Sequence, residues 1–422
     1  MSTNNYILNL LNIKDENIHI ITKCNEKLIK GKNYKIIEAF LTYSPESCPC
    51  CEAINHSYND IIKWGFRRNC IVRIPKQGNC LTRLFLHKQR FFCKHCHNTF
   101  IAETNLVNRN KNISNNTNLQ IKLELMKKQS KKDIAERMDV SVSVINRILN
   151  DISSKTVLRH PVLPNSMNWD EFKATNDTKG KMAFIITNND NGNIFDINDS
   201  RKSKDLEKFF RRYSKKERDK VKHISIDFYS GYIFLANKLF KNADISIDRF
   251  HIVIQAYNAL TNTRVKLCYK SNPYYNKLKD YWKLIVKNEN DLSDKKTFSK
   301  HFKREISQKE IVQFLINTDS TLKATYECYQ GLINSLKENN FNKFKDISFH
   351  QNNNISDKMK QALKLYKNNI KYIENSFKYD INNGIIEGTN NLIKCLKPIA
   401  FGYRKYDHFI SRIFLIKGIL KG

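Results

Sequence analysis

The period of apolar and polar positions changes several times along the chain, and these changes predict separate segments. Residues 1–40 begin with weak helical spacing and continue with short apolar stretches, but they carry no legible role. Residues 41–105 alternate apolar and polar positions in runs such as NCIVRIP and LTRLFLHKQRFF, which is typical of strands. Residues 106–155 return to helical spacing.

The spacing in residues 106–155 predicts a helix-turn-helix. Apolar residues mark one face of each of two helices, and the break falls at residues 139–141: Ile134, Ala135 and Met138, then Val144, Ile145, Ile148 and Leu149. We expect Ser141 to cap the second helix, so that Ser143, Asn146, Arg147 and Asn150 face the major groove of DNA. Any two amphipathic helices joined by a short turn would give the same pattern.

The pattern after a proline-containing linker predicts an α/β domain. Residues 156–257 give a strand, a hairpin with its turn at Asn191-Gly192, a basic helical stretch, two short buried strands and a helix, which resembles the ribonuclease H-like architecture. Residues 258–380 are helical, polar and rich in lysine, and we interpret them as a helical insertion. Residues 381–422 are predicted to complete the core. The fold class is therefore multidomain: a small β region, an all-α segment and an α/β domain.

Two C-x2-C pairs flank the strand-like runs of residues 41–105. Such pairs are typical of a structural zinc site, in which four thiolates complete a tetrahedron, and we predict one Zn2+ on Cys48, Cys51, Cys93 and Cys96. This β region is then a zinc ribbon. Cys50 offers a less suitable C-x-C spacing, and His95 or His97 could replace a thiolate. The alternative is that the cysteines are ordinary buried thiols.

Three apolar runs each deliver one carboxylate, namely Asp170, Asp227 and Glu387. Acids that converge in this way suit phosphodiester chemistry, because two divalent ions roughly 3.5 to 4 Å apart can activate the nucleophile and neutralise the leaving oxygen. Carboxylates suit Mg2+ (or Mn2+), and the same site can use a freed 3′-hydroxyl for strand transfer. Each acid alone has a simpler interpretation, because an aspartate at a strand end often caps a turn.

The residues that follow Glu387 read as a helix. Asn390, Asn391 and Lys394 share the helix face of Glu387, so we predict that they contact DNA beside the metal ions. The alternative is that these polar residues cap the helix and face solvent.

The charge of the chain favours a polyanionic partner. Its 422 residues include 73 basic and 41 acidic side chains, a net charge of +32, and this surplus is spread along the sequence. Codon usage in an AT-rich genome could account for part of the lysine excess. No apolar run is long enough to suggest a membrane span, and no secretory signal is evident, so we expect a cytoplasmic, nucleoid-associated protein.

The order of these motifs resembles that of bacterial insertion-sequence transposases of the DDE class, most closely the ISL-three family. The resemblance covers residues 45–422 and is most specific at GIIEGTNNLIKCLK and around IDFYSGY. It implies that Asp170, Asp227 and Glu387 form the catalytic triad, with Asp248 and His251 in support.

The resemblance also implies double-stranded DNA partners: the terminal inverted repeats of an element and a target. A homodimer is the hypothesis for holding two element ends together. Two other classes remain as alternatives, a sequence-specific DNA-binding regulator and a structure-specific nuclease that does not join ends. A transposase that has lost its activity is a third alternative.

Overall fold

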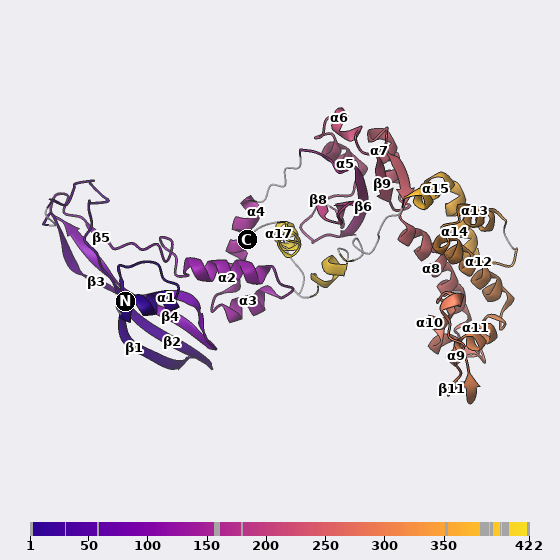
Figure 1. Ribbon diagram of the computed structural model, residues 1–422, viewed down its shortest axis with the longest axis horizontal. Coiled ribbons are helices and arrows are strands. Elements are labelled where there is room, and N and C mark those ends of the chain that lie inside the picture. Colours follow the sequence, from indigo (N-terminus) through magenta and orange to yellow (C-terminus); the bar gives the residue numbers. More distant parts are fainter. Residues whose placement is uncertain are drawn as a thin grey trace. The chain divides into compact units, whose positions relative to one another are not determined.

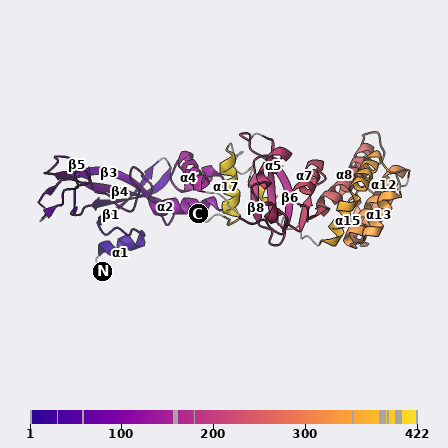
Figure 2. The same cartoon turned by 90° about the horizontal axis from the view of Figure 1, so that it is seen from above.

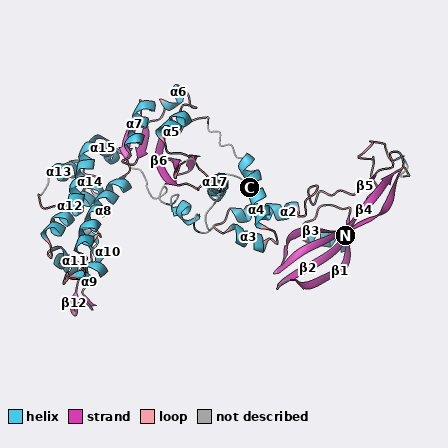
Figure 3. Cartoon of the chain, turned by 180° about the vertical axis from the view of Figure 1, so that it is seen from behind, coloured by secondary structure: helices cyan, strands magenta, loops and turns pink. Residues whose placement is uncertain are grey.

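The chain, represented by a computed structural model, forms two compact units. The structure describes residues 3–29, 31–56, 59–155, 161–178, 180–350, 353–379, 388, 391–396, 398 and 405–419. The first unit comprises Met1–Val157, Thr175–Asp177 and Leu392–Gly422, and the second comprises Leu158–Ala174 and Thr178–Asn391. Within the described ranges, no helix combines the length and apolarity that crossing a bilayer requires. Figure 3 shows the strands and helices along the chain.

The first unit contains a five-stranded sheet. Its elements are α1 (Thr3–Leu10), β1 (Ile18–Ile29), β2 (Lys32–Leu41), β3 (Ile61–Gln77), β4 (Cys80–Cys93) and β5 (Thr99–Ile101). The strand order is β1-β2-β4-β3, with β5 paired to β4, and only β2 and β4 run parallel. The predicted segments 1–40 and 41–105 thus share one sheet. Fully buried side chains such as Leu41, Leu84 and Phe91 form its core.

A helical layer completes the first unit, formed by α2 (Asn115–Leu125), α3 (Lys131–Arg137), α4 (Val142–Lys155) and α17 (Tyr406–Ile416). Ser130 starts α3 through a capping box with Asp133, and the break between α3 and α4 falls where the sequence spacing placed it. Ile134 and Leu149 pack in the core of this layer.

Residues 381–422 were predicted as part of the α/β core, but the structure places α17 elsewhere. Figure 2 shows α17 beside α4, and Leu415 of α17 is fully buried in the same core as Ile134. Arg412 is also fully buried, and its Nη2 donates to the carbonyl oxygens of Lys127 and Gln129 at 2.8 and 3.0 Å. α17 packs against this layer because Arg412 supplies the hydrogen-bond donor for these two carbonyls, which follow α2.

Asp139 ties the turn between α3 and α4 to the sheet. It adopts a positive φ of 51°, and its carboxylate accepts from Arg83 Nε on β4 at 2.7 Å and from the Tyr34 hydroxyl on β2 at 2.8 Å. The Arg83 guanidinium also stacks over the Tyr34 ring. Sheet and helices of the first unit are therefore joined by a charged, partly buried contact.

The second unit is built on a mixed five-stranded sheet (Figure 1). Its strands are β6 (Ser166–Lys173), β7 (Met182–Asn188), β8 (Ile194–Asn198), β9 (His223–Ile226) and β10 (Asp244–Ile247). The order is β10-β9-β6-β7-β8; β6, β7 and β8 are antiparallel, whereas β6, β9 and β10 are parallel. Gly192, at φ 68°, allows the tight turn between β7 and β8.

Helices cover this sheet and extend beyond it: α5 (Ser203–Phe210), α6 (Lys215–Arg218), α7 (Ser230–Leu239), α8 (Arg249–Leu267), α9 (Tyr275–Asp280), α10 (Trp282–Ile285), α11 (Gln308–Ile316), α12 (Ser320–Lys337), α13 (Phe341–Phe349), α14 (Asp357–Asn368) and α15 (Ile370–Lys378). A 3-10 turn at Glu289–Asp291 and a hairpin of β11 (Thr297–Ser299) and β12 (Arg304–Ile306) lie among them.

Trp169 anchors β6 to the helices on one face of the sheet. It is almost completely buried, stacks on Phe210 of α5 with centroids 4.7 Å apart, and meets Tyr232 of α7 edge-on at 6.3 Å. Successive side chains of a strand point to opposite faces, so Asp170 lies on the other face of β6.

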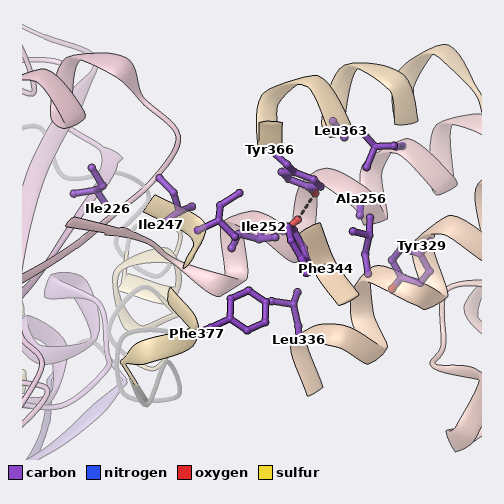
Figure 4. Close-up of a cluster of buried hydrophobic side chains, with 14 of the residues drawn as sticks. Ile226, Ile247, Ile252, Ala256, Tyr329, Leu336, Phe344, Leu363, Tyr366 and Phe377 are labelled. Atoms are coloured by element: carbon purple, nitrogen blue, oxygen red, sulfur yellow. Dashed lines mark hydrogen bonds between the residues drawn. The ribbon is translucent and has the colours of Figure 1, made fainter. Parts of the chain in front are cut away.

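The helices from α8 onward are continuous with the core of the sheet. Figure 4 shows Ile226 and Ile247 of the sheet in one apolar cluster with Ile252 of α8 and Phe344 of α13. The Tyr366 hydroxyl of α14 donates to the Ile252 carbonyl at 2.7 Å. The predicted insertion and the sheet therefore share one apolar core and form one unit.

His223 lies at the start of β9, inside the sheet. Its two ring nitrogens lie 3.0 Å from the Ser166 hydroxyl of β6 and 2.8 Å from the Ser246 hydroxyl of β10, and its ring stacks on Tyr379. Burial lowers the pKa of His223 to about 4. The His223 ring is therefore neutral in the folded protein at neutral pH.

The stability of the second unit should fall between pH 7 and pH 5. In the unfolded chain His223 binds a proton near the ordinary histidine pKa, whereas in the folded chain it does not. The free energy of unfolding therefore keeps its full His223 contribution above that pKa and declines as the pH falls toward 4. The loss at pH 5 is about 2 kcal/mol. Urea unfolding at both pH values measures this loss. Carboxylates also titrate there, so His223→Gln is the control: it should lose clearly less, and an equal loss would contradict the assignment.

Candidate functional site

The parallel strands bring three carboxylates to one level of the sheet. Asn168 of β6 pairs with Ser225 of β9, so two residues further on Asp170 stands level with Asp227. Ile226 pairs with Ile247 of β10, which places Asp248 at the same level on the other side. Two of the predicted triad and one predicted supporting acid therefore stand side by side, Asp170 within β6 and Asp227 and Asp248 directly after β9 and β10.

Local backbone contacts hold these acids in place. The Asp227 carboxylate accepts from the Tyr229 amide at 2.9 Å, and the Asp248 carboxylate accepts from the Phe250 amide at 2.9 Å, which makes Asp248 the N-cap of α8. One turn into α8, His251 Nδ1 lies 3.7 Å from Asp248 Oδ2. The start of α8 thus brings a histidine to the acids.

Electrostatic coupling shows that these groups are close together. Burial raises the pKa of Asp227; the Tyr229 amide and His251 oppose this shift, whereas Glu171 and Asp170 add to it. Burial disfavours the charged His251 ring, yet Asp248, Asp170 and Asp227 together raise its pKa. The site therefore concentrates negative charge on partly buried carboxylates, the chemistry of a donor set for a divalent cation.

Glu171 is a member of this neighbourhood that sequence reasoning did not find. It points to the Trp169 face of β6, where Arg201 Nη1 donates to both of its carboxylate oxygens at 2.7 and 2.6 Å and the Tyr232 hydroxyl lies 3.3 Å away. The DEF motif contains two adjacent acids, and from the sequence only Asp170 is assigned to the site. The hydrogen bonds from Arg201 distinguish Glu171 from Asp170.

Gly231 explains part of the IDFYSGY motif. A Cβ at this position would stand 2.6 Å from Cε1 of the Tyr229 ring and 3.1 Å from the Ser203 hydroxyl. A side chain there would push Tyr229 away, and the Tyr229 amide is the donor to Asp227. The glycine therefore protects the position of the second aspartate.

Part of the predicted site lies outside the described residues. Glu387 and Asn390 belong to that part of the chain. Residues 391–396 are helical, and Asn391 and Lys394 are exposed on this helix, whereas Leu392, Ile393 and Leu396 are buried. Whether these positions share a helix face with Glu387 and contact DNA stays a prediction.

The four predicted zinc ligands come together at one end of the first unit's sheet. The sulfurs of Cys48, Cys51, Cys93 and Cys96 all lie within 4.8 Å of one another. The Cys48–Cys96 and Cys51–Cys93 pairs are 3.7 and 3.8 Å apart, and Zn–S bonds of about 2.3 Å in a tetrahedron give an S–S edge of about 3.8 Å. The cluster therefore fits one zinc ion.

The backbone forms the same turn around both cysteine pairs. Glu52 and His97, which directly follow the second cysteine of each pair, adopt positive φ angles of 59° and 56°. Burial opposes the Cys48 thiolate, but the amides of Cys50 and Cys51 lower the pKa of Cys48 to about 6. Cys50 and His95 are not members of the cluster, and His95 instead lies 3.7 Å from Asp60.

The predicted DNA-contacting residues lie around the start of α4. Ser141, Ser143 and Arg147 are exposed. Asn146 accepts from Lys131 Nζ of α3 at 3.0 Å, which links the two helices. Arg147 lines a polar cavity of about 340 Å3 between α4 and residues 108–118, together with Asn112 and Lys111. These contacts do not test whether α4 reads DNA, which stays a prediction.

Protein purified without chelator should contain about one zinc per chain, because the four sulfurs have the spacing of a tetrahedral zinc site. Elemental analysis checks this. Cys93→Ser, which removes a buried ligand, should lose the zinc and destabilise the sheet, whereas Cys80→Ser, outside the cluster, should keep it. Wild-type protein without zinc would refute the site.

Comparison with known proteins gives a family and one partial relative. The chain is 26% identical over 132 residues to a protein named ATP-dependent protease from Lactococcus lactis subsp. lactis. This match covers 31% of the chain and 42% of that protein, so the chain spans less than half the length of the relative it matches.

A family model described as "Transposase", that of the ISL-three (ISL3) DDE transposases, matches residues 168–413, which is more than half of the chain. The matched range contains β6, β9 and β10 together with Asp170 on β6 and the two aspartates that follow β9 and β10. The chain therefore belongs to the ISL-three family of DDE transposases.

Proposed function

We propose that this transposase cleaves DNA at the terminal inverted repeats of an insertion sequence and joins the freed ends to a target. The observation that carries the proposal is the level placement of Asp170 and Asp227 on adjacent parallel strands, where their repulsion helps to raise the pKa of Asp227. A sheet of order β10-β9-β6-β7-β8, with three antiparallel and three parallel strands sharing β6, supports the ribonuclease H-like interpretation.

In this proposal Asp170, Asp227 and Glu387 hold two Mg2+ (or Mn2+) ions. Such ions would lower the pKa of the attacking water or hydroxyl and neutralise the leaving 3′-oxygen. Asp170 and Asp227 supply oxygen donors that the backbone already fixes, so little reorganisation is needed. His251 lies beside these acids, and Asp248 positions its ring.

The first unit supplies DNA binding in the same proposal. The zinc cluster fixes the ribbon of β3 and β4, and Asp139 fixes the turn of α3 and α4 against β2 and β4. We assign double-stranded DNA to α4 through Ser141, Ser143, Asn146 and Arg147, and to Asn390, Asn391 and Lys394 beside the active site. A homodimer would hold two element ends together.

Asp227→Asn should reduce strand cleavage by about a thousandfold, since it removes a cation donor worth several kcal/mol in the transition state. Glu387→Gln should have a comparable effect. The measurement is cleavage and end joining on labelled DNA that carries the element ends, with magnesium. Asp244→Asn, at the opposite end of β10, is the matched control and should retain activity. Cleavage without joining would favour a nuclease, and DNA binding with neither would favour a regulator.

A further inference from the structure

A polar groove lies between α8 and α14 in the second unit, away from the acids. It has a volume of about 460 Å3. Gln255, Asn258 and Asn262 line it from α8, and Lys358 and Gln361 line it from α14. None of the described residues that line it is acidic. Four side-chain amides and one ammonium group therefore line the groove, without a carboxylate among the described lining residues.

The packing of the two helices makes this groove a fixed feature. The Tyr366 hydroxyl of α14 donates to the Ile252 carbonyl of α8, and both residues are buried. Ala259 and Ala362 form the floor, and their small side chains leave the space open. Lys358 Nζ donates to the Gln361 amide oxygen at 3.2 Å, so the ammonium group lies among the amides.

The groove continues the helix face that begins at the carboxylates. His251, Gln255, Asn258 and Asn262 follow one another at intervals of four, three and four residues, which places them on one face of α8. His251, on the first turn, interacts electrostatically with Asp170 and Asp227. One straight polar face therefore runs from the acids to Lys358.

The chemistry of this face suits a nucleic acid strand. Amide side chains pair with base edges and donate to phosphate oxygens, and a lysine supplies a point charge for a phosphate. Resting on the function proposed above, we propose that the groove between α8 and α14 binds the DNA strand next to the scissile phosphate. This gives the helical insertion a role in substrate binding.

The length of the face defines which nucleotides it contacts. The eleven helical steps from His251 to Asn262 rise by about 16 Å, which corresponds to roughly five nucleotides at 3.4 Å each. The contacts thus fall within about five nucleotides of the cleaved bond. DNA that ends at that bond on the contacted side would leave the groove empty.

The first test compares two charge reversals on α14 that change the net charge equally. Lys358→Glu lies in the groove, whereas the exposed Lys364→Glu lies about 120° away around the helix. With duplex DNA carrying one element end and its flank, Lys358→Glu should raise KM for cleavage about tenfold, and Lys364→Glu less than about threefold. Equal effects, or no effect of Lys358→Glu, would overturn the proposal.

The second test does not depend on cleavage. A photoreactive phenylalanine analogue replaces Asn262, or Lys364 as the control, in full-length chain that also carries Asp227→Asn, and the crosslinked nucleotide is mapped. We expect crosslinks only from position 262, within about five nucleotides of the cleavage position on one side of it.

The two tests separate the groove from the catalytic assignment. Crosslinks from position 262 in the Asp227→Asn chain, together with a wild-type chain that cleaves nothing, would support the groove and refute the catalytic proposal. Cleavage by wild type without those crosslinks would refute the groove alone.

Discussion

The parallel register of β6, β9 and β10 is the constraint on which the site depends. Strand pairing fixes Asp170, Asp227 and Asp248 at one level, because Asn168 pairs with Ser225 and Ile226 pairs with Ile247. Bringing these charges together is unfavourable by itself, as the raised pKa of Asp227 shows. The apolar packing of Trp169, Ile226 and Ile247 beneath them offsets this repulsion, so the sheet's core keeps the acids together.

The second unit combines this fixed site with a long helical extension. α8 belongs to both, since Asp248 caps its start beside the acids and Asn262 lies in the groove with α14. The continuous core that includes Ile252, Phe344 and Tyr366 makes α8 a rigid connection. A change in the packing of α14 would therefore reach His251 through a helix with no break between them.

Sequence patterns predicted what depends on local spacing. The cysteine pairs, the α3–α4 break and the strands that carry Asp170 and precede Asp227 follow from short-range periodicity, and the structure contains each of them.

Contacts between distant segments could not be predicted in this way. Nothing in the spacing around Arg412 indicates that it donates to the carbonyls of residues 127 and 129, and nothing near Tyr34 indicates that it meets Asp139. Such contacts depend on the tertiary fold, which brings together segments that are far apart in the sequence. Glu387 was found from its motif alone and lies outside the described residues.

The position of α17 has a consequence for biosynthesis. Leu415 and Arg412 complete a core whose other members, such as Ile134, are made nearly three hundred residues earlier. The helical layer of the first unit therefore cannot close while the ribosome is still translating the second unit. Until α17 emerges, the part of α4 that α17 covers stays exposed, so the nascent chain carries an apolar patch for chaperones, and a message truncated before residue 405 yields a helical layer that lacks Leu415 in its core.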